Sequence, residues 1–513
     1  MRHWWLAGLA LLAGRAVAAP VVATAEGTLR GSTKAGVEAF LGVPYAAPPV
    51  GEGRWRAPQP VARWQGVREA ARFGPACAQG LAGPWGPYTA EFIAQPPISE
   101  DCLTLNLWKP AAMRKRLPVL VYVHGGAFQG GSGNQTAFDG AALARRGAVV
   151  VTINYRLGIF GFFAHPALSA ESAEHTSGNY GLQDQLAALR WVRANIARFG
   201  GDAANVTLAG ESAGAASVND LMVSPPAKGL FARAVSFSGP SMAVEVGTLA
   251  EGEREGTALA ARLGVSDLAG LRALPMDRLI AASLVKPAEG GGPPPLVWRP
   301  RVDQVVLPHD PVKPDGPVAV NVPLLGGFNA AEMIDPAVKT PGAFEAAVQR
   351  RYGAFAGRLL ALYPHGSDAE AAESNVLIGR DRYMTGLLLW ARARTKAWGQ
   401  AVYGYLYDHA YPPVRGQAGW GAFHSSELPY VFGNIGLGDR AFTAADRMVA
   451  RQWQDRLLAF MRTGNPGWPR VGAASTQVMV LGDRPGMRAA VSTPARFTAF
   501  RDYAAAGGSL GLM

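Results

Sequence analysis

The sequence predicts an α/β protein with a largely parallel sheet, and two kinds of pattern support this. Apolar runs rich in β-branched residues, at 119–123, 148–153 and 206–209, alternate with segments of helical periodicity. One helix is well marked, because apolar residues recur at spacings of four and three from Leu182 to Phe199. The pair Gly200-Gly201 then supplies a stop for that helix.

The composition is that of a folded globular protein, with 49% hydrophobic and 17% charged residues among 513. This length would allow two or three domains, although large α/β enzymes also form one continuous domain. The two loosest stretches, 78–99 and 287–300, do not resemble interdomain linkers. We therefore expect one domain over residues 19–513, with insertions.

The N-terminus has the layout of an export signal. A charged start at Met1-Arg2-His3 precedes a short apolar run at 4–14, and Ala16-Val17-Ala18 offers a small-x-small cleavage site. The apolar run is shorter than the roughly 20 residues that a membrane span needs. We expect a cleaved signal peptide at 1–18 and a secreted or periplasmic mature protein. Arg15 comes late for such a signal, so a retained anchor or a buried N-terminal helix is the alternative.

The chain has two cysteines, Cys77 and Cys102, whose pairing would fit export. Closing the loop between them would contribute roughly 3–4 kcal/mol in the chain-entropy model. In a reducing cytosol, two unpaired buried thiols would be expected instead. No Cys/His cluster has the spacing of a metal site, so the sequence predicts neither a metal nor a cofactor.

The chain is basic, with a net charge of +11 and a pI near 9.8. Its arginines are scattered, and no dense basic run or aromatic-interleaved basic stripe occurs. We therefore expect no nucleic-acid partner. A basic surface would still favour anionic substrates or envelopes through a long-range, salt-sensitive field.

The segment Gly210-Glu211-Ser212-Ala213-Gly214 is a G-x-S-x-G motif between a strand-like run and a helix-compatible run. On such a strand–turn–helix corner the serine hydroxyl is exposed above the edge of a sheet. Both glycines are needed there, because a side chain would collide with the neighbouring strand or helix. By itself the motif is also found in ordinary small-residue turns.

A second motif, His124-Gly125-Gly126-Ala127-Phe128, follows the apolar run at 117–123. Acyl transfer through a tetrahedral intermediate requires backbone N–H groups aimed at the developing oxyanion, and a glycine-rich loop after a strand brings them close. A flexible strand-to-loop turn is the alternative for this motif alone. The two motifs in this order predict serine-dependent acyl transfer.

With these motifs, the chain resembles the type-B carboxylesterase/lipase family of α/β-hydrolases, which includes carboxylesterases and cholinesterases. The matching segments are 40–51, 99–108, 154–158, 178–185, 199–202, 462–466 and 468–469, in addition to the two motifs. The resemblance implies an α/β-hydrolase fold with a central, mostly parallel sheet flanked by helices. It also implies hydrolysis of a small-molecule ester.

The resemblance assigns the catalytic residues. A serine hydroxyl needs a histidine base, and that histidine needs a carboxylate to fix its tautomer. The family motifs nominate His424, within 421–430, and Glu332, within the G-x-N-x-x-E segment 327–332; Asp335 is the nearest competitor. The order Ser212, Glu332, His424 agrees with that of α/β-hydrolases.

The same comparison implies an oxyanion hole and two supporting residues. The oxyanion donors would be the backbone N–H groups of Gly126, Ala127 and Ala213. Glu211 and Ser217 match positions beside the triad, where we expect supporting hydrogen bonds rather than chemistry.

Three positions depart from the family pattern. Met333 follows Glu332 where glycine is frequent, and Ser425 follows His424 where glycine or alanine is common. Both changes are expected to reshape the rim of the pocket without removing a reacting group. Trp85 stands in a different register from the tryptophan of cholinesterases, which argues against choline esters.

The sequence thus predicts a serine carboxylic-ester hydrolase that works through an acyl-enzyme. Two alternatives remain: an amidase or carbamate hydrolase with the same triad, and a non-catalytic binding protein on the esterase fold. Segments 84–92, 238–244 and 293–298 are candidates for the pocket walls, although aromatic and methionine side chains are more often core. The candidate lining residues are Trp85, Phe92, Met242 and Trp298.

Overall fold

The computed structural model describes residues 19–113, 115–239, 246–284, 296–313, 316–332 and 335–511. The predicted signal peptide at 1–18 lies outside the described residues, as do Met242 and Met333.

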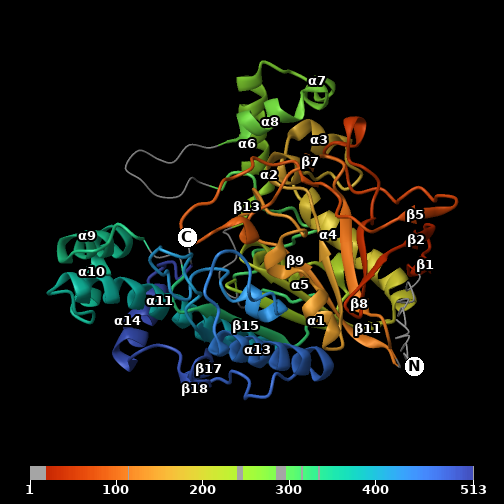
Figure 1. Ribbon diagram of the computed structural model, residues 1–513. Coiled ribbons are helices and arrows are strands. Elements are labelled where there is room, and N and C mark those ends of the chain that lie inside the picture. Colours follow the sequence, from red (N-terminus) through yellow and green to blue (C-terminus); the bar gives the residue numbers. More distant parts are fainter. Residues whose placement is uncertain are drawn as a thin grey trace, which may run out of the picture.

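An 11-stranded sheet forms the centre of the molecule (Figure 1). In spatial order its strands are β18 (Gly486–Ala489), β17 (Gln477–Gly482), β16 (Val402–Asp408), β15 (Leu324–Asn329), β12 (Arg233–Phe237), β11 (Gly201–Glu211), β9 (Leu117–Val123), β10 (Val149–Ile153), β8 (Thr104–Pro110), β4 (Val37–Pro44) and β3 (Ser32–Lys34). All neighbours from β17 to β10 are parallel, and the pairs at the two edges are antiparallel. This arrangement confirms the predicted α/β fold with a mostly parallel sheet.

The central strands are buried on both faces, which explains why they are continuous apolar runs in the sequence. Every residue of β9 and β10 is buried. The predicted helix is α4 (Tyr180–Asn195), whose last turn continues as a 3₁₀ segment at Ile196–Phe199. Gly200 ends it in the left-handed conformation, with φ +80°.

Helices cover the sheet, and several contact the strands that carry the two motifs. Helix α5 (Ala213–Val223) contacts β9, β11 and β12, while α13 (Ala444–Thr463) contacts β9, β11 and β17. The other helices beside the sheet and its loops are α1 (Ala141–Arg145), α2 (Gly158–Phe162), α3 (Pro166–Glu171) and α12 (Leu428–Phe432).

Two helical groups project from this body (Figure 1). The first comprises α6 (Leu249–Leu263), α7 (Leu268–Ala273) and α8 (Met276–Ser283). The second comprises α9 (Pro341–Tyr352), α10 (Ala356–Leu360), α14 (Pro494–Ala505) and the start of α11 (Asp368–Trp398), and it has an apolar core of its own. The rest of α11 contacts β15 and β16.

The described residues also form three small sheets. They are β1 (Val21–Ala23) with β2 (Thr28–Arg30) and β5 (Val67–Glu69), then β6 (Ala76–Cys77) with β7 (Ile98–Ser99), and β13 (Gly247–Thr248) with β14 (Arg301–Val302). Within the ranges that the structure describes, no helix combines the length and apolar character needed to cross a bilayer.

Candidate active site

Ser212 stands between the end of β11 and the start of α5, as the motif predicts. Its backbone has φ +56° and ψ −121°, a conformation that a residue with a side chain rarely adopts. A Cβ added to Gly210 would lie 2.2 Å from the Gly214 carbonyl oxygen, and one added to Gly214 would lie 2.1 Å from the Val123 carbonyl oxygen. The two glycines therefore let strand, turn and helix pack this closely, and they leave Ser212 half-buried and accessible.

The glycine-rich loop after β9 lies against this corner. A Cβ on Gly125 would be 3.0 Å from Ser212 Cβ and 2.7 Å from Glu211 Oε2. The next three residues all have positive φ, at +111° for Gly126, +56° for Ala127 and +61° for Phe128. Backbone N–H groups in tight turns can form a concavity that binds an anion.

The three N–H groups predicted to form an oxyanion hole have no hydrogen-bond partner among the described residues. Gly126 and Ala127 lie in the loop, and Ala213 is the first residue of α5, where an N–H has no partner within the helix. Unpaired amides beside a nucleophile are available to a bound anion.

His424 and Glu332 come together although they are far apart in sequence. Glu332 follows β15, and His424 lies between β16 and α12. Nδ1 of His424 is hydrogen-bonded to Glu332 Oε2, and both residues are buried. The competitor Asp335 is exposed and accepts a bond from its neighbour Ala337.

Further groups hold the Glu332 carboxylate in place. Its Oε1 accepts hydrogen bonds from the backbone N–H of Asn329, at 2.8 Å, and from the hydroxyl of Ser238. Tyr383, on α11, accepts the backbone N–H of Glu332 at 3.2 Å and donates to the carbonyl of Asn329. This network fixes the orientation of the carboxylate toward the imidazole.

The other ring nitrogen of His424 faces a second carboxylate. Nε2 lies 3.1 Å from Glu211 Oε1, and no hydrogen bond joins His424 to the Ser212 hydroxyl among the described residues. Hydrogen bonds of a catalytic base are often long in the absence of substrate, so this geometry is compatible with a base at this position.

Buried charge dominates the electrostatics of the site. Burial would lower the pKa of His424, but the charges of Glu332, Glu211 and Glu427 outweigh burial and raise that pKa to about 10. Burial also raises the pKa of Glu211, and it raises the pKa of Glu427 to about 8 with help from the charges of Glu211 and Glu332. Burial thus favours the protonated form of both carboxyl groups.

Several residues of this network have no signal of their own in the sequence. Glu427, Ser238 and Tyr383 join the site only because β12, β15 and β16 lie side by side. Ser217, which we expected beside the triad, accepts a hydrogen bond from Gln185 of α4 at 3.0 Å.

Two other buried histidines have structural contacts. His124 stacks on Tyr155, and burial lowers its pKa to about 4, so its ring is neutral. His409, at the end of β16, lies between Asp483 and Asp446, at 2.8 Å and 3.0 Å.

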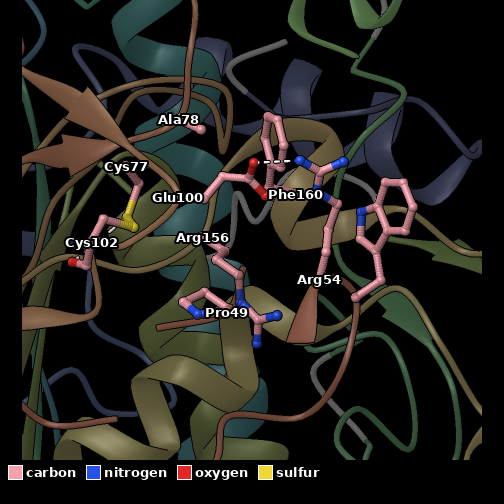
Figure 2. Close-up of a pocket in the computed structure, with 9 residues that line it drawn as sticks. Pro49, Arg54, Cys77, Ala78, Glu100, Cys102, Arg156 and Phe160 are labelled. Atoms are coloured by element: carbon pink, nitrogen blue, oxygen red, sulfur yellow. Dashed lines mark hydrogen bonds and ion pairs between the residues drawn. A yellow bond between two sulfur atoms is a disulfide. The ribbon is translucent and has the colours of Figure 1, made fainter. Parts of the chain in front are cut away.

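Cys77 and Cys102 form a disulfide, as expected. Beside it is a small cavity of about 10 Å³, which is room for about one water molecule and contains no predicted catalytic residue. Figure 2 shows Arg54 and Glu100 paired on its wall, with the disulfide to one side. The cavity residues are Pro49, Arg54, Trp55, Cys77, Ala78, Glu100, Cys102, Arg156 and Phe160.

The loop closed by the disulfide reaches His424. Tyr88 donates its hydroxyl to the carbonyl oxygen of His424 at 3.0 Å. Arg440 holds the same segment through Glu91, at 3.1 Å, and through the Thr89 hydroxyl, at 2.7 Å. Trp85, at the tip of the loop, is 58% exposed, whereas Trp298 is buried and donates to the carbonyl of Ser283.

Comparison with known proteins places this geometry in context. A family model described as "Carboxylesterase family" matches residues 18–496. Fumonisin B1 esterase from Sphingopyxis macrogoltabida is 37% identical over 490 residues, covering 90% of this chain and 86% of that protein. Para-nitrobenzyl esterase from Bacillus subtilis is 36% identical, with 90% and 94% covered. Phenmedipham hydrolase from Pseudarthrobacter oxydans is 34% identical, with 90% and 95% covered.

Solved structures agree with these sequence relatives. A PNB esterase superposes with a TM-score of 0.77 at 32% identity, covering 94% of this chain and all of the other. A thermophilic PNB esterase gives a TM-score of 0.76 at 31% identity, with the same coverage. The residues matched by the family model, 18–496, include the central sheet, both motifs, Glu332 and His424.

Proposed function

Because this chain belongs to the carboxylesterase family, we propose that it hydrolyses carboxylic esters through a Ser212–His424–Glu332 triad and an acyl-enzyme. The observation that carries the proposal is the buried pairing of His424 Nδ1 with Glu332 beside a strained serine elbow. A histidine fixed through Nδ1 in this way leaves Nε2 as the ring nitrogen that can accept the serine proton.

In the proposed mechanism, His424 Nε2 takes the proton of Ser212 while Oγ attacks the ester carbonyl. The tetrahedral oxyanion accepts hydrogen bonds from the N–H groups of Gly126, Ala127 and Ala213, which have no hydrogen-bond partner among the described residues. His424 returns its proton to the leaving alcohol as the C–O bond breaks. Water, deprotonated by the same nitrogen, then attacks the acyl-enzyme and releases the acid and Ser212.

The buried acid has a separate task in this mechanism. Glu332 holds the ring orientation through Nδ1 and stabilises the imidazolium that forms in each step. Backbone and hydroxyl donors surround the carboxylate, which keeps it in place as the charge on the ring changes.

The proposed substrate is a small-molecule ester. Three relatives of similar identity are named for different compounds, which supports the reaction class more than any one substrate. The same triad would also cleave an amide or a carbamate, since His424 can protonate a leaving amine. Matched phenyl ester, anilide and phenyl carbamate substrates separate these activities by their kcat/KM values.

The test of the proposed function is hydrolysis of p-nitrophenyl esters of increasing acyl length by the mature protein and by Ser212→Ala. We expect serine-dependent turnover with an optimum in chain length. Turnover retained by pure Ser212→Ala would contradict the triad. Absence of both turnover and fluorophosphonate labelling in folded wild type would favour a binding role for this fold.

We also propose that residues 1–18 are removed on export and that the mature protein is secreted or periplasmic. The disulfide supports this, because such bonds persist in oxidising compartments. N-terminal sequencing of protein from the periplasm or medium should begin at residue 19. An intact Met1 in that fraction would point to a retained anchor.

A further inference from the structure

Ser425, the residue after His424, has a conformation and a contact that the proposed mechanism does not use. Its φ is +75°, in the left-handed region that glycine occupies without strain, and its side chain is buried. Its hydroxyl donates a hydrogen bond to Glu211 Oε1 at 2.6 Å.

That oxygen is the one that faces the catalytic base. Glu211 Oε1 lies 3.1 Å from His424 Nε2, so the Ser425 hydroxyl and the imidazole approach the same carboxylate atom. Glu211 is the residue before Ser212, and its carboxylate is buried against Gly125. Ser425 therefore bridges the loop of the base and the elbow of the nucleophile.

An unopposed carboxylate at this place would impede the reaction. A base must have an unprotonated Nε2 in order to accept the serine proton, and a buried anion 3.1 Å away favours the protonated ring. A hydrogen bond to the anion weakens that effect, because it stabilises the carboxylate without a proton from the ring.

We propose that Ser425 is a positioning residue of the reaction: its hydroxyl holds Glu211 Oε1 and competes with the imidazole for it, which keeps His424 Nε2 free for the proton of Ser212. This inference rests on the proposed function, because it assigns Nε2 as the base. In the proposed mechanism, Ser425 contacts neither the substrate nor the reacting atoms.

Other ionisable groups also pack around Glu211 and His424. Glu332 holds Nδ1, and Glu427 approaches from the start of α12. Burial raises the pKa of four surrounding tyrosines, which stay neutral: Tyr88, Tyr122, Tyr155 and Tyr405. Among these groups, Glu211 accepts the hydrogen bond from the Ser425 hydroxyl, and Tyr88 also lies within reach of that hydroxyl.

Glu211 and His424 are close enough to titrate as one coupled pair. Without the Ser425 hydroxyl, this pair should bind its proton more tightly, whichever of the two residues carries it. The acid limb of kcat/KM should then move to higher pH by roughly one unit, since a hydrogen bond to a charged group is of that order. At pH values below the limb, kcat/KM should fall about tenfold, whereas the alkaline plateau should change by less than about twofold.

The experiment measures kcat/KM for the best p-nitrophenyl ester of the series from pH 5 to 11, a range that extends above the pKa of about 10 for His424, in wild type, Ser425→Gly and Ser425→Ala. Both variants lack the hydroxyl, but glycine is unstrained at φ +75° and alanine is not. Equal shifts in the two variants assign the effect to the hydroxyl. A shift in alanine alone assigns it to the backbone and overturns the proposal.

A double-mutant cycle with Glu211→Gln completes the test. The shift caused by Ser425→Gly should disappear in the Glu211→Gln background, because the neutral amide carries no charge for the hydroxyl to stabilise. The proposal is overturned if folded Ser425→Gly has the same acid limb of kcat/KM as wild type. It is also overturned if Ser425→Gly still shifts that limb in the Glu211→Gln background. If wild-type turnover does not depend on Ser212, the proposed function fails and the role of Ser425 fails with it. If turnover depends on Ser212 but the limb does not move, the role of Ser425 alone is overturned.

Discussion

The carboxyl groups of Glu332 and Glu427 lie on either side of one hydroxyl, that of Ser238. Ser238 Oγ donates to Glu332 Oε1 and lies 3.4 Å from Glu427 Oε1. Asn329 also contacts both, with its backbone N–H on Glu332 and its side-chain amide on Glu427. Two buried acids that share donors are unfavourable when both are ionised, which favours a proton on Glu427.

Glu427→Gln should make the protein more stable at alkaline pH than wild type. The pKa of Glu427 is raised in the folded state, from 4.5 to about 8, so its proton is bound more tightly in the folded than in the unfolded chain. The contribution of Glu427 to the wild-type unfolding free energy is then largest below pH 4.5. It disappears as the pH rises through about 8. Glutamine is neutral and similar in shape, so the unfolding free energy of the variant should not fall in this pH range. The fall expected in wild type is on the order of a few kcal/mol.

Urea unfolding at pH 5, 7 and 9 provides the measurement. The difference in unfolding free energy between Glu427→Gln and wild type should grow with pH and level off above pH 8. A difference that is independent of pH would mean that Glu427 is ionised in the folded protein.

Glu332→Gln should reduce kcat by roughly three to four orders of magnitude, because the amide no longer fixes the histidine tautomer. Nδ1 of His424 contacts Glu332 directly, and the negative charge of Glu332 raises the pKa of His424. The remaining activity should therefore have its acid limb at lower pH than in wild type.

Asp335→Asn is the matched control for this variant, since Asp335 is exposed and only three positions away. It should keep kcat within about twofold of wild type. Equal losses in both variants would show that the loop, and not the Glu332 carboxylate, determines activity.

The sequence predicts the parts of the site that are local in the chain. The elbow around Ser212 and the loop at Gly126 each lie within a few residues of a strand, so strand, turn and glycine patterns are enough to find them. The family resemblance added Glu332 and His424, which no spacing connects. The disulfide could be expected because the chain has two cysteines.

The remaining contacts depend on the order of strands in the sheet. Ser238 and Glu332 are 94 positions apart, and Tyr88 and His424 are 336 apart. β15 pairs with β12 on one side and β16 on the other, so their ends bring Ser238, Glu332 and the His424 loop together. The sequence predicts that Ser425 reshapes the pocket rim, and the structure adds that its hydroxyl donates to Glu211.

Gly214→Ala should disrupt the elbow. The added Cβ would lie 2.1 Å from the carbonyl oxygen of Val123, so α5 must move away from β9. We expect a loss of about 3 kcal/mol in unfolding free energy and at least a roughly 100-fold loss of kcat, because the serine shifts relative to the base.

Gly357→Ala provides the comparison, because Gly357 is exposed in α10 and a Cβ there meets nothing within 4 Å. Alanine should be neutral or stabilise by about 0.5–1 kcal/mol there. Thermal unfolding and ester hydrolysis of both variants check the pair. Wild-type activity in Gly214→Ala would mean that the corner can widen without moving Ser212.

The disulfide should stabilise the fold without being required for catalysis. Cys77→Ala/Cys102→Ala removes the cross-link and should cost about 3–4 kcal/mol of unfolding free energy. The part of the loop nearest the site keeps two other anchors, from Tyr88 to the His424 carbonyl and from Arg440 to Glu91. The position of His424 should therefore be kept, and kcat at 25 °C should stay within about fivefold of wild type.

Wild type measured in dithiothreitol should unfold at the same urea concentration as the double variant. A kcat loss above roughly 100-fold in folded double variant would show that the cross-link itself positions His424.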